Sequence, residues 1–193
     1  MQRWTRTALS AVAVVGLAAG LFAIGTAAGA PPSLREPSAT SAARLDPTEQ
    51  AVADLQRELD RVPGKWPAWT SLGQVYVNQA RLTADPTLYD KAAGAFTRSL
   101  ELQPEDNDAA LTGQATLAAA RHDFAGALAL TDRALAINDF SPTTWAVRSD
   151  ALTELGRYDE ARDAVQRLLD LSPGTVDGLT RASYVFELRG ARG

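Results

Sequence analysis

The chain has 193 residues, 46% of them hydrophobic, and a formal net charge of −4, which suits one domain of ordinary size with additional segments. Lysine and arginine are scattered along the sequence, so the basic patch that nucleic-acid binding needs is not expected. The absence of cysteine excludes disulfide bonds, thiolate metal sites and a cysteine nucleophile.

Residues 1–30 are predicted to form a signal peptide or a transmembrane anchor. Arg3 and Arg6 precede an uncharged run from Ala8 to Ala30, which is long enough for the roughly 20 residues that cross a bilayer as a helix. Basic residues before the run place the N-terminus in the cytoplasm and the remainder outside it. Small residues before Pro31 suit cleavage, but the run is longer than the usual signal-peptide core. We therefore expect either a protein anchored on the extracytoplasmic face of the membrane or a secreted one.

Residues 31–45 are predicted to be a disordered linker. This stretch is rich in proline, serine and alanine and shows no helical or strand periodicity. It separates the N-terminal segment from the part of the chain that is patterned for folding.

From Asp46 onward the sequence repeats itself. Four segments that begin with alanine, AVADL, AAGAF, ALALT and ARDAV, start 41, 35 and 34 residues apart. Each is followed at the same distance by a residue that ends the unit: Pro63, Pro104, Asp139 and Pro173. Between the first two segments, the residues Trp69, Leu72, Gly73 and Tyr76 form one stripe of an α-helix.

This pattern resembles the tetratricopeptide repeat (TPR) family, whose consensus is W-x2-L-G-x2-Y, then A-x3-F, then P, on a period of 34. The resemblance implies an all-α fold, a right-handed solenoid of about eight antiparallel helices over residues 46–193. The expected units are a half-repeat at 46–63, repeats at 64–104, 105–139 and 140–173, and a half-repeat at 174–193. The middle repeat departs most from the consensus, with Leu111, Ala118, Thr131 and Asp139 at its Trp, Tyr, Phe and Pro positions.

The first helical hairpin is expected to be longer than the others. Ala92 follows Trp69 by seven residues more than the repeat requires, which adds about two helical turns. Asp85 is expected to cap the second helix of this hairpin, with Pro86 in its first position, and Asp46 and Glu49 to form a capping box for the preceding helix. The extra turns are either a neutral insertion or a partner-contacting lip, whose members would be Leu82, Leu88 and Tyr89.

In TPR proteins the first helices of successive repeats line a concave groove in which peptides or partner helices dock. The resemblance therefore places a binding site on the helix faces that point away from the packed stripe. The residues predicted to bind a partner are Thr70, Gln74, Asn78, Thr112, Thr116, Asp150, Glu154, Arg181 and Tyr184. This lining is polar and becomes acidic toward the C-terminus, which favours a neutral or basic ligand. The lysine clamp of chaperone-binding TPR domains has no counterpart, because Lys65 and Lys91 are the only lysines.

No catalytic constellation is predicted. His122 is the only histidine and falls in a turn, and Asp150 with Glu154 is expected to serve recognition rather than acid–base chemistry. Phosphate-binding glycine loops, a serine nucleophile elbow and a zinc-binding HExxH motif do not occur. We therefore expect neither an enzyme nor a metal, cofactor or small-molecule substrate.

The function predicted from the sequence is a non-catalytic scaffold or adaptor that binds an unidentified protein or peptide in the groove. Two alternatives stay open at this point. One is an assembly factor that resembles the membrane-anchored TPR subunit of cytochrome c biogenesis. The other is a structural homo-oligomer formed through the C-terminal helix.

Overall fold

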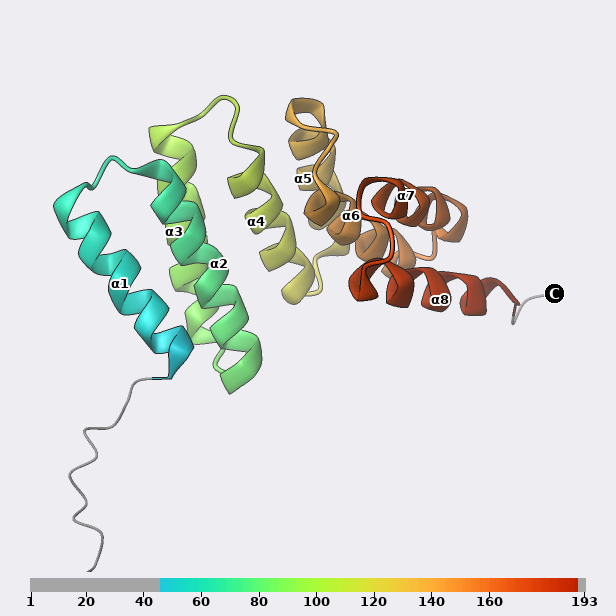
Figure 1. Ribbon diagram of the computed structural model, residues 1–193, viewed down its shortest axis with the longest axis horizontal. Helices are drawn as coiled ribbons and strands as arrows, with labels where there is room; N and C mark the ends of the chain where they lie inside the picture. The colour runs from blue at the N-terminus through green and yellow to red at the C-terminus, as the bar shows by residue number, and fades with distance from the viewer. Residues whose placement is uncertain (1–45, 191–193) are drawn as a thin grey trace, which may run out of the picture. The chain divides into compact units, whose positions relative to one another are not determined.

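A computed structural model describes residues 46–190 of the chain, so the segments predicted as signal or anchor and as linker lie outside the described residues. The described part is all-α and contains eight helices, as the repeat pattern predicted (Figure 1). The helices are α1 (Pro47–Arg61), α2 (Trp66–Thr83), α3 (Thr87–Leu102), α4 (Asp108–Ala120), α5 (Phe124–Ile137), α6 (Pro142–Glu154), α7 (Tyr158–Leu171) and α8 (Val176–Gly190).

Each helix packs against the next one, and the even-numbered helices also contact each other in series. Contacts join α2 to α4, α4 to α6 and α6 to α8, whereas within residues 46–190 no such contact joins α3 to α5 or α5 to α7. The even-numbered helices therefore lie on the inner side of the curved stack and the odd-numbered helices on the outer side. This is the right-handed solenoid that the TPR resemblance implied.

Trp69 and Trp145 make the same hydrogen bond in the first and third repeats, so they occupy equivalent positions. The indole nitrogen of Trp69 donates a hydrogen bond to the carbonyl oxygen of Pro63 at 2.9 Å. The indole of Trp145 donates in the same way to the carbonyl of Asp139 at 2.8 Å. Because the bond uses a backbone carbonyl, aspartate can replace proline at the end of the middle repeat without losing it.

Small residues let neighbouring helices approach each other closely. The ring of Phe96 on α3 is fully buried and lies against Gly73 on α2 and Gly113 on α4. A Cβ atom at Gly73 would come within 2.6 Å of this ring, and one at Gly113 would come closer still. Alanines such as Ala92 and Ala161 also allow close helix packing, and they have no exposed surface.

The first hairpin is longer than the others, as predicted. Helices α2 and α3 have 18 and 16 residues, whereas α4 and α5, like α6 and α7, have 13 and 14. The idea of an exposed lip is wrong for Leu88, which is buried, and Tyr89 is half-buried with the Arg121 guanidinium 6.0 Å from its ring. Of these three residues only Leu82 is largely exposed to solvent, at 77%.

The predicted helix starts are present, with one shift. Asp46 and Glu49 form the expected capping box of α1. Helix α3 begins at Thr87, and its N-cap is Pro86, which had been expected in the first helical position, and not Asp85. Asp85 lies one residue earlier, where its Oδ1 accepts from the hydroxyl and the backbone N–H of Thr87 at 2.7 and 2.9 Å. These two hydrogen bonds hold the pKa of the Asp85 carboxyl below its usual value.

A buried asparagine joins the first complete repeat to the second. Asn107 caps α4 by accepting from the backbone N–H of Ala110 at 3.2 Å. Its side-chain amide donates to the carbonyls of Ser99 and Gln103, both at 3.2 Å, and to the Ser99 hydroxyl oxygen at 3.1 Å. The Ser99 hydroxyl in turn donates to the carbonyl of Trp66 at 2.9 Å. This network satisfies helix ends that would otherwise be buried without partners.

None of the helices within residues 46–190 is both long enough and apolar enough to cross a membrane.

Candidate ligand-binding groove

The inner side of the stack carries two hollows in succession. The first has a volume of about 370 Å³ and lies where α2, α4 and the start of α6 meet. Its lining is polar apart from one alanine and consists of Thr70, Ser71, Gln74, Asp108, Ala109, Thr112, Ser141 and Thr143. The second, of about 90 Å³, lies between α6 and α8. It is lined by Ser149, Asp150, Thr153, Glu154, Arg181, Tyr184 and Val185.

Three of the predicted binding residues line the first hollow: Thr70, Gln74 and Thr112. Gln74 is the most available of them, since Thr70 shares a 2.7 Å hydrogen bond with the Ser99 hydroxyl. Thr112 is only 5% exposed, and its hydroxyl bonds to the carbonyl of Asp108 at 2.8 Å and to the Thr144 hydroxyl at 2.7 Å. Thr112 therefore ties α4 to α6 and contributes little free hydrogen-bonding capacity to the hollow.

Two predicted residues on these helices lie outside the first hollow. Thr116 is buried and donates its hydroxyl to the carbonyl of Thr112 at 2.9 Å. Asn78 is exposed one turn beyond Gln74, and its side-chain oxygen accepts from the Gln74 amide at 3.5 Å. Thr116 is thus a structural residue, whereas Asn78 extends the polar inner face of α2.

Sequence reasoning missed the charged group of the first hollow. Asp108 is the first residue of α4, and its Oδ2 accepts from the side-chain amide of Asn138 at 2.9 Å. Ser141 and Thr143, at the start of α6, were missed for the same reason. Helix N-terminal residues look like capping residues in a sequence, and only the stacking of the repeats shows that they also face the groove.

In the second hollow the structure brings together Asp150, Glu154, Arg181 and Tyr184, all four of which were predicted. Arg181 Nε and Nη2 donate to the two carboxylate oxygens of Asp150, each at 2.8 Å, and Arg181 also pairs with Asp177. Burial of Arg181 disfavours its charge, but the hydrogen bonds to Asp150 and Asp177 outweigh this and raise its pKa above the usual value.

The Asp150–Arg181 pair changes the expected charge of the groove. The sequence predicted an acidic C-terminal end, but Asp150 is neutralised by an arginine from the next inner helix. Two exposed polar groups remain there, the carboxylate of Glu154 and the phenol of Tyr184. The ion pair joins α6 to α8, so Asp150 has a structural role in addition to lining the hollow.

The other candidates from the sequence lie away from these hollows. His122 is exposed in the turn between α4 and α5, and its ring meets the edge of Phe124 at a centroid distance of 5.6 Å. Within the described residues no group of histidine, aspartate or glutamate side chains is placed to hold a metal ion. Neither Lys65, which pairs with Glu58, nor Lys91, which lies over the Tyr76 ring, lines either hollow.

Stacked helical hairpins with an inner groove define an α-solenoid repeat protein. Residues 112–175, which run from within α4 to just past the end of α7, match the tetratricopeptide repeat family. None of the curated protein sequences is similar to the chain.

Solved structures of TPR proteins share the fold. A thermophilic TPR protein of Thermus thermophilus superposes with a TM-score of 0.64 at 19% identity, over 72% of this chain and 73% of that protein. The first TPR domain of Spaghetti (RPAP3), bound to the HSP90 peptide SRMEEVD, gives 0.57 at 21% identity, over 65% and 94%. YrrB, described as a TPR protein with an unusual peptide-binding site, gives 0.53 at 21% identity, over 75% and 71%.

Proposed function

We propose that this protein is a non-catalytic adaptor that binds a peptide or a partner helix along the inner face of its solenoid. The observation that supports the proposal most directly is the succession of two polar hollows on the even-numbered helices. Solved TPR domains of the same fold bind peptides, among them the domain in complex with the HSP90 peptide.

The lining of the first hollow favours a neutral or basic ligand. Ser71, Gln74 and Thr143 offer hydroxyl and amide groups that can pair with a peptide backbone, and Asp108 supplies the only charge. At the far end, Glu154 offers a second exposed carboxylate. The HSP90 peptide in the Spaghetti complex is itself acidic. A peptide of that kind would meet carboxylates here, so we do not expect it to be the ligand.

We further propose that the adaptor acts outside the cytoplasm, held at the membrane by residues 1–30 or released if they are cleaved. This proposal rests on the uncharged run Ala8–Ala30 and on Arg3 and Arg6 before it. A tethered adaptor would meet its ligand at the membrane surface, so partners should be sought in membrane preparations.

The test is a crosslinking pull-down from membranes with the full-length chain and two matched triple variants. The groove variant is Gln74→Ala, Asn78→Ala and Glu154→Gln, which spares the Asp150–Arg181 pair. The control carries comparable amide and carboxylate changes at exposed positions of α1, α3 and α7: Gln50→Ala, Glu101→Gln and Gln166→Ala.

We expect partners captured by the wild type and by the control variant to be lost with the groove variant, while circular dichroism shows the same helix content in all three. Identical captures from the wild type and the groove variant would show that the inner face is not the binding site.

Assembly of several copies through α8 is a second candidate, because this helix exposes an apolar face. Val176, Leu179 and Phe186 are between 51% and 81% exposed, although they are large apolar residues. In the third repeat, Trp145 and Leu152 occupy the positions that correspond to Leu179 and Phe186 in the last, and both pack into the core there. A molecular mass that rises with concentration, and that stays at the monomer value in Phe186→Ser, would favour this candidate.

A further inference from the structure

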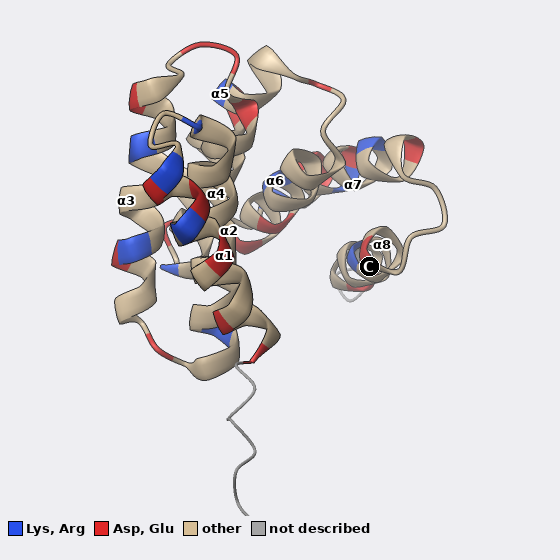
Figure 2. Ribbon diagram, turned by 60° about the vertical axis from the view of Figure 1, so that its left-hand side comes forward, with Lys and Arg blue, Asp and Glu red and all other residues tan. Residues whose placement is uncertain are grey.

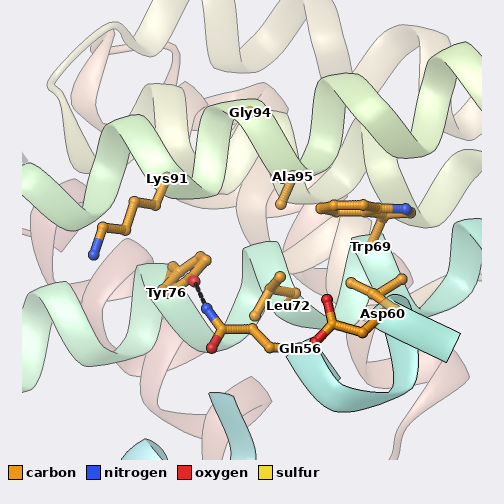
Figure 3. A pocket seen from close by; sticks show the side chains of 9 residues that line it. Gln56, Asp60, Trp69, Leu72, Tyr76, Lys91, Gly94 and Ala95 are labelled. Carbon is orange, nitrogen blue, oxygen red and sulfur yellow. Dashed lines mark hydrogen bonds between the residues drawn. The ribbon is translucent and has the colours of Figure 1, made fainter. Parts of the chain in front are cut away.

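A pocket on the outer side of the first hairpin has a chemistry of its own. It has a volume of about 330 Å³ and lies between α1, α2 and α3 (Figure 3). Trp69, Leu72 and Tyr76 line it from α2 at positions i, i+3 and i+7. Thr70 and Gln74, which line the inner groove, lie on the opposite face of the same helix. The pocket is therefore separate from the proposed ligand groove.

Both aromatic walls of this pocket are held in place by hydrogen bonds. The Trp69 indole is fixed by the carbonyl of Pro63 at 2.9 Å, and the Tyr76 hydroxyl accepts from the side-chain amide of Gln56 at 2.9 Å. Gly94 on α3 leaves the rim open, since no atom lies within 4 Å of the position where its Cβ would be. A ligand side chain would thus enter a preformed pocket and would not have to order its walls.

The pocket carries a negative charge at one end and a positive charge at the other. Asp60 on α1 lies beside Trp69 and Leu72 (Figure 3), is exposed, and makes no hydrogen bond or ion pair with another described residue. At the other end, the Lys91 ammonium lies over the Tyr76 ring, 5.9 Å from its centre. Trp69 and Tyr76 are seven residues apart on α2, which separates the two ends by about 10 Å. Elsewhere on α1 and α3, charges of both signs are interspersed (Figure 2).

An aromatic wall next to a free carboxylate suits a cationic side chain. The aliphatic stem of arginine or lysine can pack on Leu72, while the charged head meets the Trp69 ring and the Asp60 carboxylate. Lys91 at the far end would meet an acidic group about 10 Å away, which is the distance covered by seven residues of a helix.

The corresponding pocket of the third repeat lacks this chemistry. Arg148 replaces Leu72 on its floor, and Arg167 lines it as well. The position of Asp60 is taken by Ala136. Glu160 and Asp163 also line that pocket, but they pair with Arg157 and Arg162, so a cation would find no unpaired carboxylate there. The feature therefore belongs to the first hairpin and is not a general consequence of the repeat.

We propose that the pocket between α1 and α3 binds an arginine or lysine side chain of a helical partner segment that carries an acidic residue seven positions away. The partner docks on the outer side of the stack between α1 and α3, over the pocket, with its cation at Asp60 and its acid at Lys91. The protein thus has a second docking surface, independent of the inner groove.

The test is selection of a random 12-residue peptide library on the immobilised full-length chain. The three variant baits are Asp60→Asn, the matched control Asp54→Asn on the same helix outside the pocket, and the single substitution Gln74→Ala in the inner groove. We expect the wild type, Asp54→Asn and Gln74→Ala to enrich peptides with an arginine or lysine and an acidic residue seven positions away. Asp60→Asn should not enrich them.

A selected peptide and its arginine→citrulline analogue then give a quantitative readout. Citrulline keeps the shape of arginine without its charge, so we expect its Kd to be about tenfold higher on the wild type and within about twofold on Asp60→Asn. The proposal is overturned if no peptide with this charge pattern is enriched, if Asp60→Asn enriches the same peptides, or if Gln74→Ala rather than Asp60→Asn abolishes their binding.

Discussion

Phe96 shows how single residues set the distance between helices in this protein. Its ring is fully buried between α2 and α4 because the residues that face it, Gly73 and Gly113, have no side chain. Glycine is normally unfavourable inside a helix, by about 1 kcal/mol relative to alanine. Here that cost is offset by the burial of a complete phenyl ring, which explains why two glycines can occupy helix interiors.

We therefore expect Gly113→Ala to destabilise the protein by about 1–3 kcal/mol, because the added methyl group overpacks the Phe96 ring. Urea unfolding followed by circular dichroism measures this change. Combining Gly113→Ala with Phe96→Leu should recover part of the loss, since the smaller side chain makes room.

Gly94→Ala is the control for this experiment, because a Cβ at that position of α3 meets no atom within 4 Å. It should leave stability unchanged or increase it by up to about 1 kcal/mol through helix propensity alone. If Gly113→Ala were as stable as Gly94→Ala, the close contact with Phe96 would be disproved.

At the scale of elements, the last helix depends on side-chain contacts with the two helices before it. Helix α8 buries Ala182 and Val185 against the preceding hairpin but leaves its opposite face exposed. The bidentate pair between Arg181 and Asp150 adds a polar contact between α8 and α6. Since no described helix covers the other side of α8, this ion pair carries a larger share of its docking than it would in a complete repeat.

Arg181→Ala is expected to loosen α8 specifically. The pair is half-exposed on its aspartate side, so after solvent screening its loss should cost roughly 1 kcal/mol. Hydrogen exchange of the α8 amides should then speed up about fivefold, while α2 and α3 stay unchanged. Arg162→Ala is the control, since Arg162 is half-exposed on α7 and, among residues 46–190, pairs only with its neighbour Asp163. Equal exchange in both variants would rule out a docking role for Arg181.

At the scale of the whole described domain, the hydrophobic core is divided in two. One buried cluster is built from α1 to α3 with Leu117 of α4, and the other from α5 to α8. Helices that are more than two positions apart in the chain do not touch within residues 46–190. Stability in such an array is close to a sum of local terms and nearest-neighbour terms.

Phe96→Ala should therefore unfold one half of the domain preferentially. Loss of this ring costs about 3–5 kcal/mol in a packed core, and hydrogen exchange should rise strongly in α1 to α4 and only slightly in α7 and α8. Leu152→Ala, in the second cluster, should give the reverse pattern. An equal rise across all eight helices in both variants would mean that the domain unfolds as one cooperative unit.

The sequence by itself determined the number of helices, their order and the longer first hairpin. These features follow from local signals, namely the spacing of apolar and small residues, the capping aspartates and the prolines that end repeats. Such signals are residue types and their spacing along the chain, so they can be recognised without knowing which helices pack against each other. The residues that this periodicity assigned to the groove and that do line one of the two hollows include Gln74, Asp150, Glu154, Arg181 and Tyr184.

Only the tertiary structure decided which polar residues are available for binding. Thr112 and Thr116 lie on the expected helix but are buried. Their hydroxyls bond to carbonyls one turn earlier in α4, and Thr112 also meets Thr144 of the next inner helix. Asp150 meets Arg181, which is 31 residues later in the chain, and loses its free charge. Asp60 stays free beside Trp69 for the opposite reason, since no cation of the following repeat reaches it. Charge pairing and burial depend on contacts between repeats, and no local pattern in the sequence encodes them.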